Sequence, residues 1–400
     1  MSNCDTNATA VRGPADNSCN LACEGIAKRL ADQPGPCQMT MTDAHRVDAD
    51  MTKVLEFLIL DRFPDPAIEK AWRACLDEVR FPSHYCAPEF FLEPFWEGKH
   101  PFAILALEQD TVVGVLTGLH ENEQTESGLQ WRPQICVRDG AGFEAVLDAL
   151  ARGLIEAAGS SSLVSVFSWR WNPLGVFSRY GFRHRSFEGD VVLDLTRGAE
   201  SVFHEFSKNR RRDIRLAIKN GVEVFEASTS EDFLAYYDVY LRWRQTARKT
   251  VQGSVVPYET FERALRLKDS RRVFLARFSG RIIAGTSIRY YPKGLVEYSE
   301  NASLDDFLHV CPNDLLLWRS IEWACKASFP QYSLGAADYF HRKCGGTVVP
   351  IDRYRLDRTW LGTHTFRERL MESGREVFHR LPGPLTNTLR GLLKRQGSRR

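Results

Sequence analysis

Two things are scarce in this 400-residue sequence: closely paired cysteines and long apolar runs. None of the ten cysteines belongs to a CxxC pair, so the usual spacing of a zinc site is missing, and a chain of this length needs no disulfide framework. Nowhere do about 18 apolar residues follow one another, and no early segment joins a charged start to a long apolar run. We therefore expect no bound metal, reduced cysteines and a cytoplasmic protein.

A strong excess of charge of one sign is also missing. The formal net charge is +2, which argues against a protein whose whole surface is built to bind nucleic acid. With 43% hydrophobic and 26% charged residues, the composition is that of a soluble globular protein, and the length favours two domains over one. Residues 1–50 are rich in Asn, Asp, Ala, Ser and Thr and predict a disordered leader.

The rest of the chain repeats one series of elements. Two strands joined by a polar turn precede a long helix, a short strand, a short helix that ends in glycine, and a further strand. The first copy comprises 102–119, 141–158, 163–169, 173–182 and 190–195, and the second comprises 272–290, 313–327, 332–335, 337–346 and 351–356. This repetition predicts an α/β (α+β) protein with two copies of one unit, 51–206 and 207–360, and a basic amphipathic tail at 361–400.

Positive charge gathers in two segments. The helix predicted at 207–221 starts with four cations that form either a solvated face or a contact for a polyanion, such as tRNA or a lipid-linked pyrophosphate. These cations are Lys208, Arg210, Arg211 and Arg212. Within 367–400, arginines and lysines alternate with Phe and Leu. That mixture fits either an interfacial helix on anionic lipid, at the inner face of the membrane, or a C-terminal helix that covers the core.

Each unit resembles the GNAT N-acyltransferase fold, and the tandem arrangement resembles the FemAB-like branch of that superfamily. The resemblance rests on KNRRRDIRLAIKNGVEV (208–224), PNDLLLWRSIEWA (312–324) and YFHRKCGG (339–346), which are similar to that branch's basic helix, Pro-Asn helix start and aromatic-basic-Gly turn. Residues 378–397 are similar to the tail of FemAB-like proteins associated with exosortase and exopolysaccharide systems. The resemblance implies two tandem GNAT-like units, each a mixed, mostly antiparallel sheet flanked by helices.

The resemblance also implies where an acyl donor binds. Many acyl-CoA users have a Gln/Arg-x-x-Gly-x-Gly/Ala loop at a helix start, where backbone N–H groups hold the pyrophosphate. The first half has Arg138, Gly140 and Gly142 there, one position out of register. The second half has no glycine at this place, and its donor-binding candidates are Asn313 and Lys343.

Candidates for the chemistry lie in the second half. Glu297 and Glu300 fall on the strand that holds the donor in the GNAT fold, and each carboxylate either acts as a base or pairs with an arginine. Tyr339 follows the next strand, where GNAT enzymes often carry a leaving-group acid, and it either supplies that proton or merely packs. His341, which stands where relatives have lysine, and Asp338 have the same two interpretations.

These observations favour an N-acyltransferase that moves an acyl group from acyl-CoA, a co-substrate rather than a bound cofactor, to an amine. The amine is a small-molecule or lipid-linked acceptor in envelope or exopolysaccharide synthesis. A second interpretation is aminoacyl transfer from aminoacyl-tRNA, which the missing second glycine loop and the basic helix favour. A third is a non-catalytic double domain that serves binding or assembly, for which His341 is the best indication.

Overall fold

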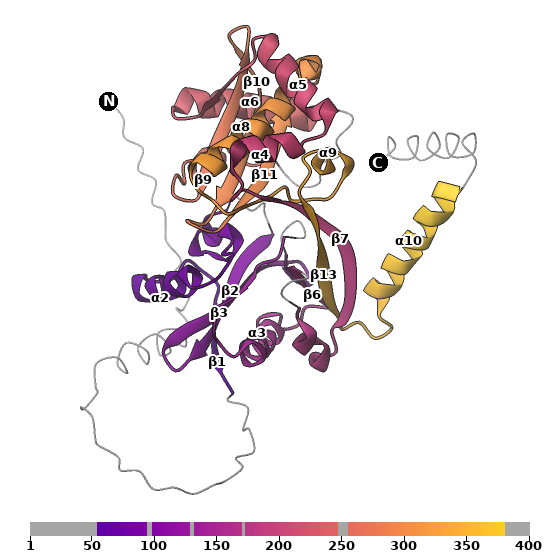
Figure 1. The fold of residues 1–400 in the computed structure, drawn as a ribbon. Helices are drawn as coiled ribbons and strands as arrows, with labels where there is room; N and C mark the ends of the chain where they lie inside the picture. Colours follow the sequence, from indigo (N-terminus) through magenta and orange to yellow (C-terminus); the bar gives the residue numbers. More distant parts are fainter. Residues whose placement is uncertain (1–53, 94–97, 129–131, 170–172, 247–254, 381–400) are drawn as a thin grey trace, which may run out of the picture. The chain divides into compact units, whose positions relative to one another are not determined.

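The structure, a computed structural model, describes residues 54–93, 98–128, 132–169, 173–246 and 255–380 (Figure 1). The predicted leader at 1–50 and the end of the tail at 381–400 lie outside these residues. Within the described ranges, no helix has the length and apolar character needed to cross a membrane. No group of three or more His, Cys, Asp and Glu side chains in these ranges is arranged to hold a metal ion, and the six cysteines described are free thiols.

The described strands form one 13-stranded sheet, in the order β1-β2-β3-β4-β6-β13-β7-β12-β11-β10-β9-β8, with β5 beside β3. We call residues 54–194 the first half and residues 198–357 the second half. The strands of the first half are β1 (Glu56–Leu60), β2 (Lys99–Glu108), β3 (Thr111–Glu121), β4 (Gln124–Ser127), β5 (Ile135–Val137), β6 (Leu163–Trp169) and β7 (Arg183–Asp194). Those of the second half are β8 (Glu223–Glu226), β9 (Arg271–Phe278), β10 (Arg281–Tyr290), β11 (Leu295–Ser303), β12 (Gln331–Ser333) and β13 (Thr347–Asp357).

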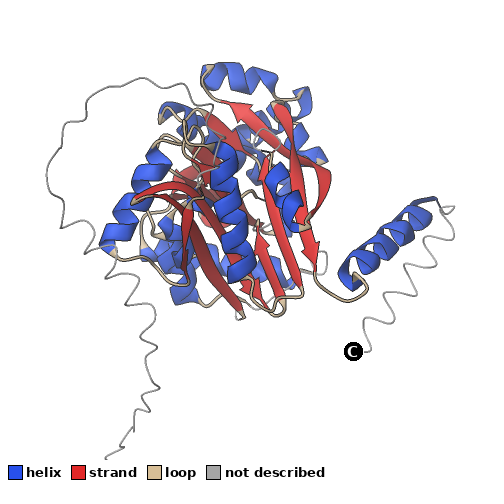
Figure 2. Cartoon of the chain, turned by 90° about the horizontal axis from the view of Figure 1, so that it is seen from below, coloured by secondary structure: helices blue, strands red, loops and turns tan. Residues whose placement is uncertain are grey.

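Helices cover both faces of this sheet (Figure 2). The α-helices are α2 (Pro66–Asp77), α3 (Phe143–Ala157), α4 (Gly198–Glu205), α5 (Lys208–Lys219), α6 (Ser230–Gln245), α7 (Tyr258–Leu265), α8 (Pro312–Lys326), α9 (Tyr339–Arg342) and α10 (Thr363–Arg380). Short 3₁₀ helices are η1 (His84–Cys86), η2 (Pro88–Leu92), η4 (Gly175–Tyr180) and η5 (Asp305–Val310).

Strand β2 shows how the sequence specifies these layers. Phe102, Ile104 and Ala106 pack with the buried side chains of α3, whereas Ala103 and Leu105 pack with those of α2. Successive side chains of a strand point to opposite faces, so a strand between two helical layers must be apolar at every position. The uninterrupted apolar run in β2 meets that requirement.

The repeated series predicted from the sequence is present, and the second strand of each hairpin has a glycine that faces a helix. A Cβ at Gly114 in β3 would overlap Val146 of α3, and a Cβ at Gly285 in β10 would overlap Tyr236 of α6. Each glycine therefore lets a helix lie close to the sheet. One prediction was too short, because β7 begins at Arg183 rather than at 190. Its first residues are mostly exposed and polar, and they are strand only because they pair with β13.

The two halves exchange their last strands. β13, from the second half, pairs with β6 of the first half, and β7, from the first half, pairs with β12 of the second half. β7 and β13 also pair with each other, and Figure 1 shows them running side by side between the halves. The repeat in the sequence predicted two copies of a unit but not this exchange. The domain boundary between residues 206 and 207 stays a prediction.

Helix α10 lies at the start of the predicted tail, and one of its carboxylates bonds to the sheet. Glu368 accepts hydrogen bonds from Arg353 Nη2 at 2.8 and 2.9 Å and from Arg355 Nη1 at 2.6 Å. Phe366 and Leu370 remain 67% and 63% exposed. These two apolar side chains are therefore not covered by the described core, and the affinity for anionic lipid stays a prediction.

A buried carboxylate from the first half joins the two halves electrostatically. Glu93, which follows η2, accepts hydrogen bonds from Arg289 Nε and Nη2 at 2.8 and 2.7 Å and also pairs with Arg271. Burial alone would raise the pKa of Glu93, but the charges of Arg271 and Arg289 hold that pKa well below its usual value. His84, whose pKa is lowered by burial, lies with Nε2 2.7 Å from Glu93 Oε1. The interface thus contains an ionised carboxylate, a neutral imidazole and two guanidinium groups.

We expect Glu93→Gln to lower the free energy of unfolding by about 3–5 kcal/mol, because the buried Arg271 and Arg289 lose the carboxylate that pairs with both of them. Urea unfolding monitored by circular dichroism measures this change. Asp238→Asn is the matched control, because Asp238 pairs with Arg242 at 3.0 Å on the surface and its loss should cost no more than about 1 kcal/mol. Equal effects of the two variants would contradict the assignment.

Candidate active site

Each half of the sheet contains one place where two parallel strands separate. In the first half, β4 and β6 pair in parallel from Gln124 to Ser127, after which β5 pairs with β3 instead. In the second half, β11 and β12 pair in parallel only from Leu295 to Glu297. Beyond these points the strands leave a gap in the hydrogen-bonded ladder. The two gaps differ in what occupies them.

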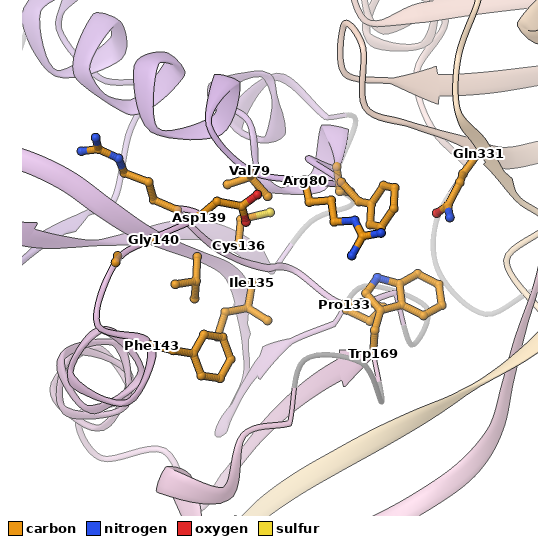
Figure 3. A pocket seen from close by; sticks show the side chains of 15 residues that line it. Val79, Arg80, Pro133, Ile135, Cys136, Asp139, Gly140, Phe143, Trp169 and Gln331 are labelled. Carbon is orange, nitrogen blue, oxygen red and sulfur yellow. The ribbon is translucent and has the colours of Figure 1, made fainter. Parts of the chain in front are cut away.

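The gap of the first half opens into a cavity of about 540 Å³, which we call the first-half cavity (Figure 3). One wall is β5, and the opposite wall includes Trp169 at the end of β6. Residues that follow α2, among them Arg80 and Ser83, line it as well, and so does Gln331 from the second half. Figure 3 shows the side chain of Arg80 extending toward Trp169. The volume lies in the range of sites that hold a small molecule or cofactor.

Among the described strands β5 pairs only with β3, so no described strand takes the hydrogen-bonding positions of its other edge. Arg138 N donates to Val113 O at 2.9 Å, and Thr117 N donates to Gln134 O at 3.0 Å. Because backbone groups in an antiparallel pair alternate in direction, those of Ile135 point away from β3. An extended ligand in the first-half cavity can therefore pair with this edge as an added strand would.

The outer end of the cavity is the loop that starts α3. Gly140 has a φ of +81°, a conformation that favours glycine, and the N-cap residue Gly142 has no side chain to bond the first turn. The N–H groups of a helix start and the helix dipole favour an anion at this position. Arg138 also lines the cavity, with its Nε donating to Glu78 Oε2 at 2.6 Å. The predicted donor loop thus lies at the mouth of the first-half cavity.

The inner end of the cavity leads to a buried carboxyl group of the second half. Ser83 lines the cavity, and its hydroxyl donates to Glu297 Oε2 at 2.7 Å. Glu297 is 1% exposed, and this burial raises its pKa to about 7, although the charge of Arg132 and the bond from Ser83 oppose the shift. A carboxyl group with this pKa can accept and release a proton near neutral pH.

Asp190 is a second buried carboxyl group in this region. Burial raises its pKa to about 7, while a hydrogen bond from Ser333 and the charge of Arg132 lower it. The charge of Asp190 in turn raises the pKa of Glu297. Asp190, Ser83 and Arg132 were not predicted from the sequence, which carries no signal for contacts between segments so far apart.

The gap of the second half is occupied by Arg132 from the first half. Its Nη1 donates to Tyr85 Oη at 2.8 Å, and its Nη2 donates to Tyr298 O on β11. A Cβ at Gly335, just after β12, would overlap Nη2. The guanidinium therefore fills the point where β11 and β12 separate.

The other predicted catalytic residues are spread over the second half. Glu300 accepts hydrogen bonds from Ser287 at 3.0 Å and Arg289 at 2.9 Å. Burial would raise the pKa of Glu300, but the charge of Arg289 and that of Arg271 hold it below its usual value. The sequence left open whether Glu300 acts as a base or pairs with an arginine, and in the structure it pairs with Arg289.

The turn that contains Tyr339 holds this tyrosine at the surface. Tyr339 is 76% exposed, and Lys343 Nζ lies 4.5 Å from its ring centroid. His341 lies closer to the second gap, with its ring centroid 6.0 Å from that of Tyr298. Burial lowers the pKa of His341, and its Nδ1 lies 2.9 Å from Asp338 Oδ1. Tyr339 and Glu297 are thus not parts of one cluster.

Asn313 does not cap helix α8. The helix begins at Pro312, and its N-cap is Cys311, because proline suits the first helical position. The Asn313 side chain instead donates to Ser303 Oγ at 3.2 Å and accepts from Asn301 at 3.4 Å.

Of the four cations predicted to meet a polyanion, one is buried. Arg210 donates to Phe340 O at 2.8 Å and lies 3.4 Å from Asp314 Oδ1. It cannot reach a ligand from there, so it holds α5 against the turn that contains Phe340. Lys208 and Arg212 are exposed, and Arg211 donates to His204 O at 2.6 Å.

Comparisons with known proteins agree with this architecture. Residues 205–343 match the family model for an acetyltransferase (GNAT) domain. A search of curated proteins finds no match. Among solved structures, FemX is 14% identical with a TM-score of 0.55, over 71% of this chain and 95% of FemX.

Two further solved structures are similar in fold to this chain. The C-terminal domain of a putative lysylphosphatidylglycerol synthetase from Agrobacterium fabrum is 13% identical, with a TM-score of 0.51, over 73% of this chain and 92% of that one. A tandem GNAT protein from the clavulanic acid biosynthesis pathway is 12% identical, with a TM-score of 0.50, over 76% and 99%. The chain therefore has a FemAB-like GNAT fold.

Proposed function

We propose that this chain is an N-acyltransferase that takes an acyl group from acyl-CoA bound in the first-half cavity and transfers it to an amine. The observation that carries the proposal is the composition of this cavity. It has a helix start at its mouth, a free strand edge along its wall and, at its inner end, a serine bonded to a carboxyl group with a pKa of about 7. These are the three parts that binding and aminolysis of a thioester require.

In this proposal the donor lies along β5. The loop from Arg138 to Gly142 holds the pyrophosphate through backbone N–H groups, and the pantetheine arm pairs with the free edge at Ile135. The thioester then lies near Ser83, where the cavity ends. Holding both reactants in line is worth about 7–11 kcal/mol of the barrier.

The reaction needs no protein nucleophile. The amine nitrogen attacks the thioester carbonyl, a C–N bond forms, and the C–S bond breaks to release the CoA thiolate, which water protonates. The proton lost by the amine passes through the Ser83 hydroxyl to Glu297, whose pKa suits a base at neutral pH. Tyr339 has no part in this scheme, because its side chain is exposed whereas Ser83 is buried. The role of Tyr339 as an acid stays a prediction.

A second candidate is aminoacyl transfer from tRNA. The structural likeness to FemX and the exposed Lys208 and Arg212 on α5 favour it, and Asn313 and Lys343 are then the donor contacts. Equilibrium binding of the purified protein to acetyl-CoA and to charged tRNA separates the two. The sequence predicts that the acceptor amine belongs to envelope or exopolysaccharide synthesis, and the proposal keeps this acceptor. Binding of neither donor would favour the non-catalytic alternative.

We expect Gly142→Asp to weaken acetyl-CoA binding by about 10-fold or more, because it places a negative charge where the pyrophosphate lies. Asp is also a better N-cap residue than Gly, so the protein should fold normally. Gly142→Asn is the matched control, since it has the same shape without the charge. Isothermal titration calorimetry measures the affinities, and equal affinities of the two variants would argue against a pyrophosphate at this loop.

We expect Glu297→Gln to lower kcat by about 10²–10⁴-fold with a small change in KM for the donor, because the variant keeps the size of the side chain but cannot take up the proton. The rate of the wild type should rise with pH through about 7, where Glu297 becomes ionised. Glu300→Gln is the control and should retain most activity. A full rate in Glu297→Gln would place the base elsewhere.

The raised pKa of Glu297 also predicts a stability effect that needs no substrate. Its pKa rises from 4.5 to about 7 on folding, so the folded state binds the proton more tightly. This contribution to stability is complete below about pH 4.5 and is lost as the pH rises through about 7. The Tm of Glu297→Gln relative to the wild type should therefore increase between about pH 5 and pH 8. A constant difference in Tm over this range would show that Glu297 is ionised throughout.

A further inference from the structure

A second, smaller cavity lies beside the first-half cavity on the same face of the sheet. It measures about 340 Å³, and one of its walls is Phe167 of β6. Phe167 and Trp169 are two residues apart on one strand, so their side chains share a face, and Trp169 lines the first-half cavity. Both side chains also belong to one buried cluster with Ile351. The two cavities are therefore neighbours along β6.

The wall of the smaller cavity is mostly apolar. Phe167, Phe187 and Ile351 line it together with Ala336 and Ala337. Arg185 and Arg353 each lie 5.0 Å from the centroid of the Phe187 ring, but neither arginine lines the cavity. A ligand rich in hydroxyl groups would lose its hydrogen bonds with water here and regain few of them.

The rim of the smaller cavity is acidic. Glu188 and Asp338 are the ionisable residues among its lining side chains. Glu188 pairs with an arginine, since its Oε2 lies 3.0 Å from Arg342 Nη2. Asp338 lies 2.9 Å from His341 Nδ1, and burial lowers the pKa of that imidazole, which favours its neutral form. Asp338 is thus the group that remains for a cation.

The smaller cavity also lies next to the proton-accepting groups. Gly189 lines it, and the next residue in β7 is the buried Asp190, which interacts electrostatically with Glu297. A molecule in the smaller cavity therefore lies against the strand that carries one of these two carboxyl groups.

We propose that the smaller cavity is the acceptor site and that it takes a primary amine carried on an apolar or aromatic group. The ammonium group meets Asp338 at the rim, and the apolar body lies between Phe167, Phe187 and Ile351. This assignment rests on the proposed acyltransferase function and narrows its acceptor. As the acceptor substrate it favours an arylalkylamine over an amino sugar, because the hydroxyl groups of the sugar would find no partners on this wall.

The test measures binding of amines to the full-length protein by ligand-observed NMR, without donor. Phenethylamine is the probe, 2-phenylethanol lacks its charge, and glucosamine lacks its apolar body. We expect phenethylamine to bind at least about 10-fold more tightly than either, because a charge-assisted hydrogen bond and apolar burial each contribute more than about 1.4 kcal/mol. Equal or tighter binding of glucosamine would overturn the proposal.

Three variants locate the binding site. Ala336→Phe should fill the smaller cavity and abolish phenethylamine binding while leaving acetyl-CoA binding unchanged. Ala141→Phe, in the wall of the first-half cavity, should do the reverse. Asp338→Asn should weaken phenethylamine about 10-fold without affecting 2-phenylethanol, and Asn can still cap α9 as Asp338 does.

The outcomes separate the acceptor assignment from the donor assignment. Phenethylamine binding that survives both Ala336→Phe and Asp338→Asn overturns the acceptor site, whatever acetyl-CoA does. If Gly142→Asp and Ala141→Phe both still bind acetyl-CoA normally, the donor site is overturned and the acceptor site is not. If Ala336→Phe fails to fold, the comparison of amine and alcohol in Asp338→Asn decides the question.

Discussion

Neither half of the sheet is complete without the last strand of the other half. β13 lies between β6 and β7, and β7 supplies the partner of β12, so the place where each half opens is bordered by a strand from its neighbour. Backbone hydrogen bonds across these pairs fix the register of one half against the other. The distance between the two gaps in the ladder is therefore set by strand pairing and not by the packing of two separate domains.

The polar groups of the site depend on this arrangement. The bond from Ser83 to Glu297 and the insertion of Arg132 beneath Tyr298 both cross between the halves. Such groups are costly to bury unless they are paired, and each of them finds its partner on the other half. Burial between the two halves raises the pKa of Glu297 and also keeps water away from this carboxyl group. The raised pKa is therefore a consequence of the interface.

Local patterns predicted the elements well because each is specified by nearby residues: the hairpins by their polar turns, and the buried strands by uninterrupted apolar runs. They failed where pairing decides the structure, as in the polar start of β7. Glu297 could be singled out because it is a carboxyl group on a central strand, but its partner Ser83 is 214 positions away. One error was avoidable: Arg210, Ile214 and Ala217 have helical spacing, which predicts that Arg210 shares the buried face.

The exchange of strands also affects how the chain is made. β6 pairs at residues 163–169 with β13 at residues 351–357, so that edge of the first half stays open until nearly the whole described chain has left the ribosome. An apolar strand with an unpaired edge is prone to associate with other chains, and distant pairings form slowly. Co-translational folding of the first half therefore stops at a partly closed sheet. The release of the C-terminal strand from the ribosome is what allows both halves to reach the native state in one step.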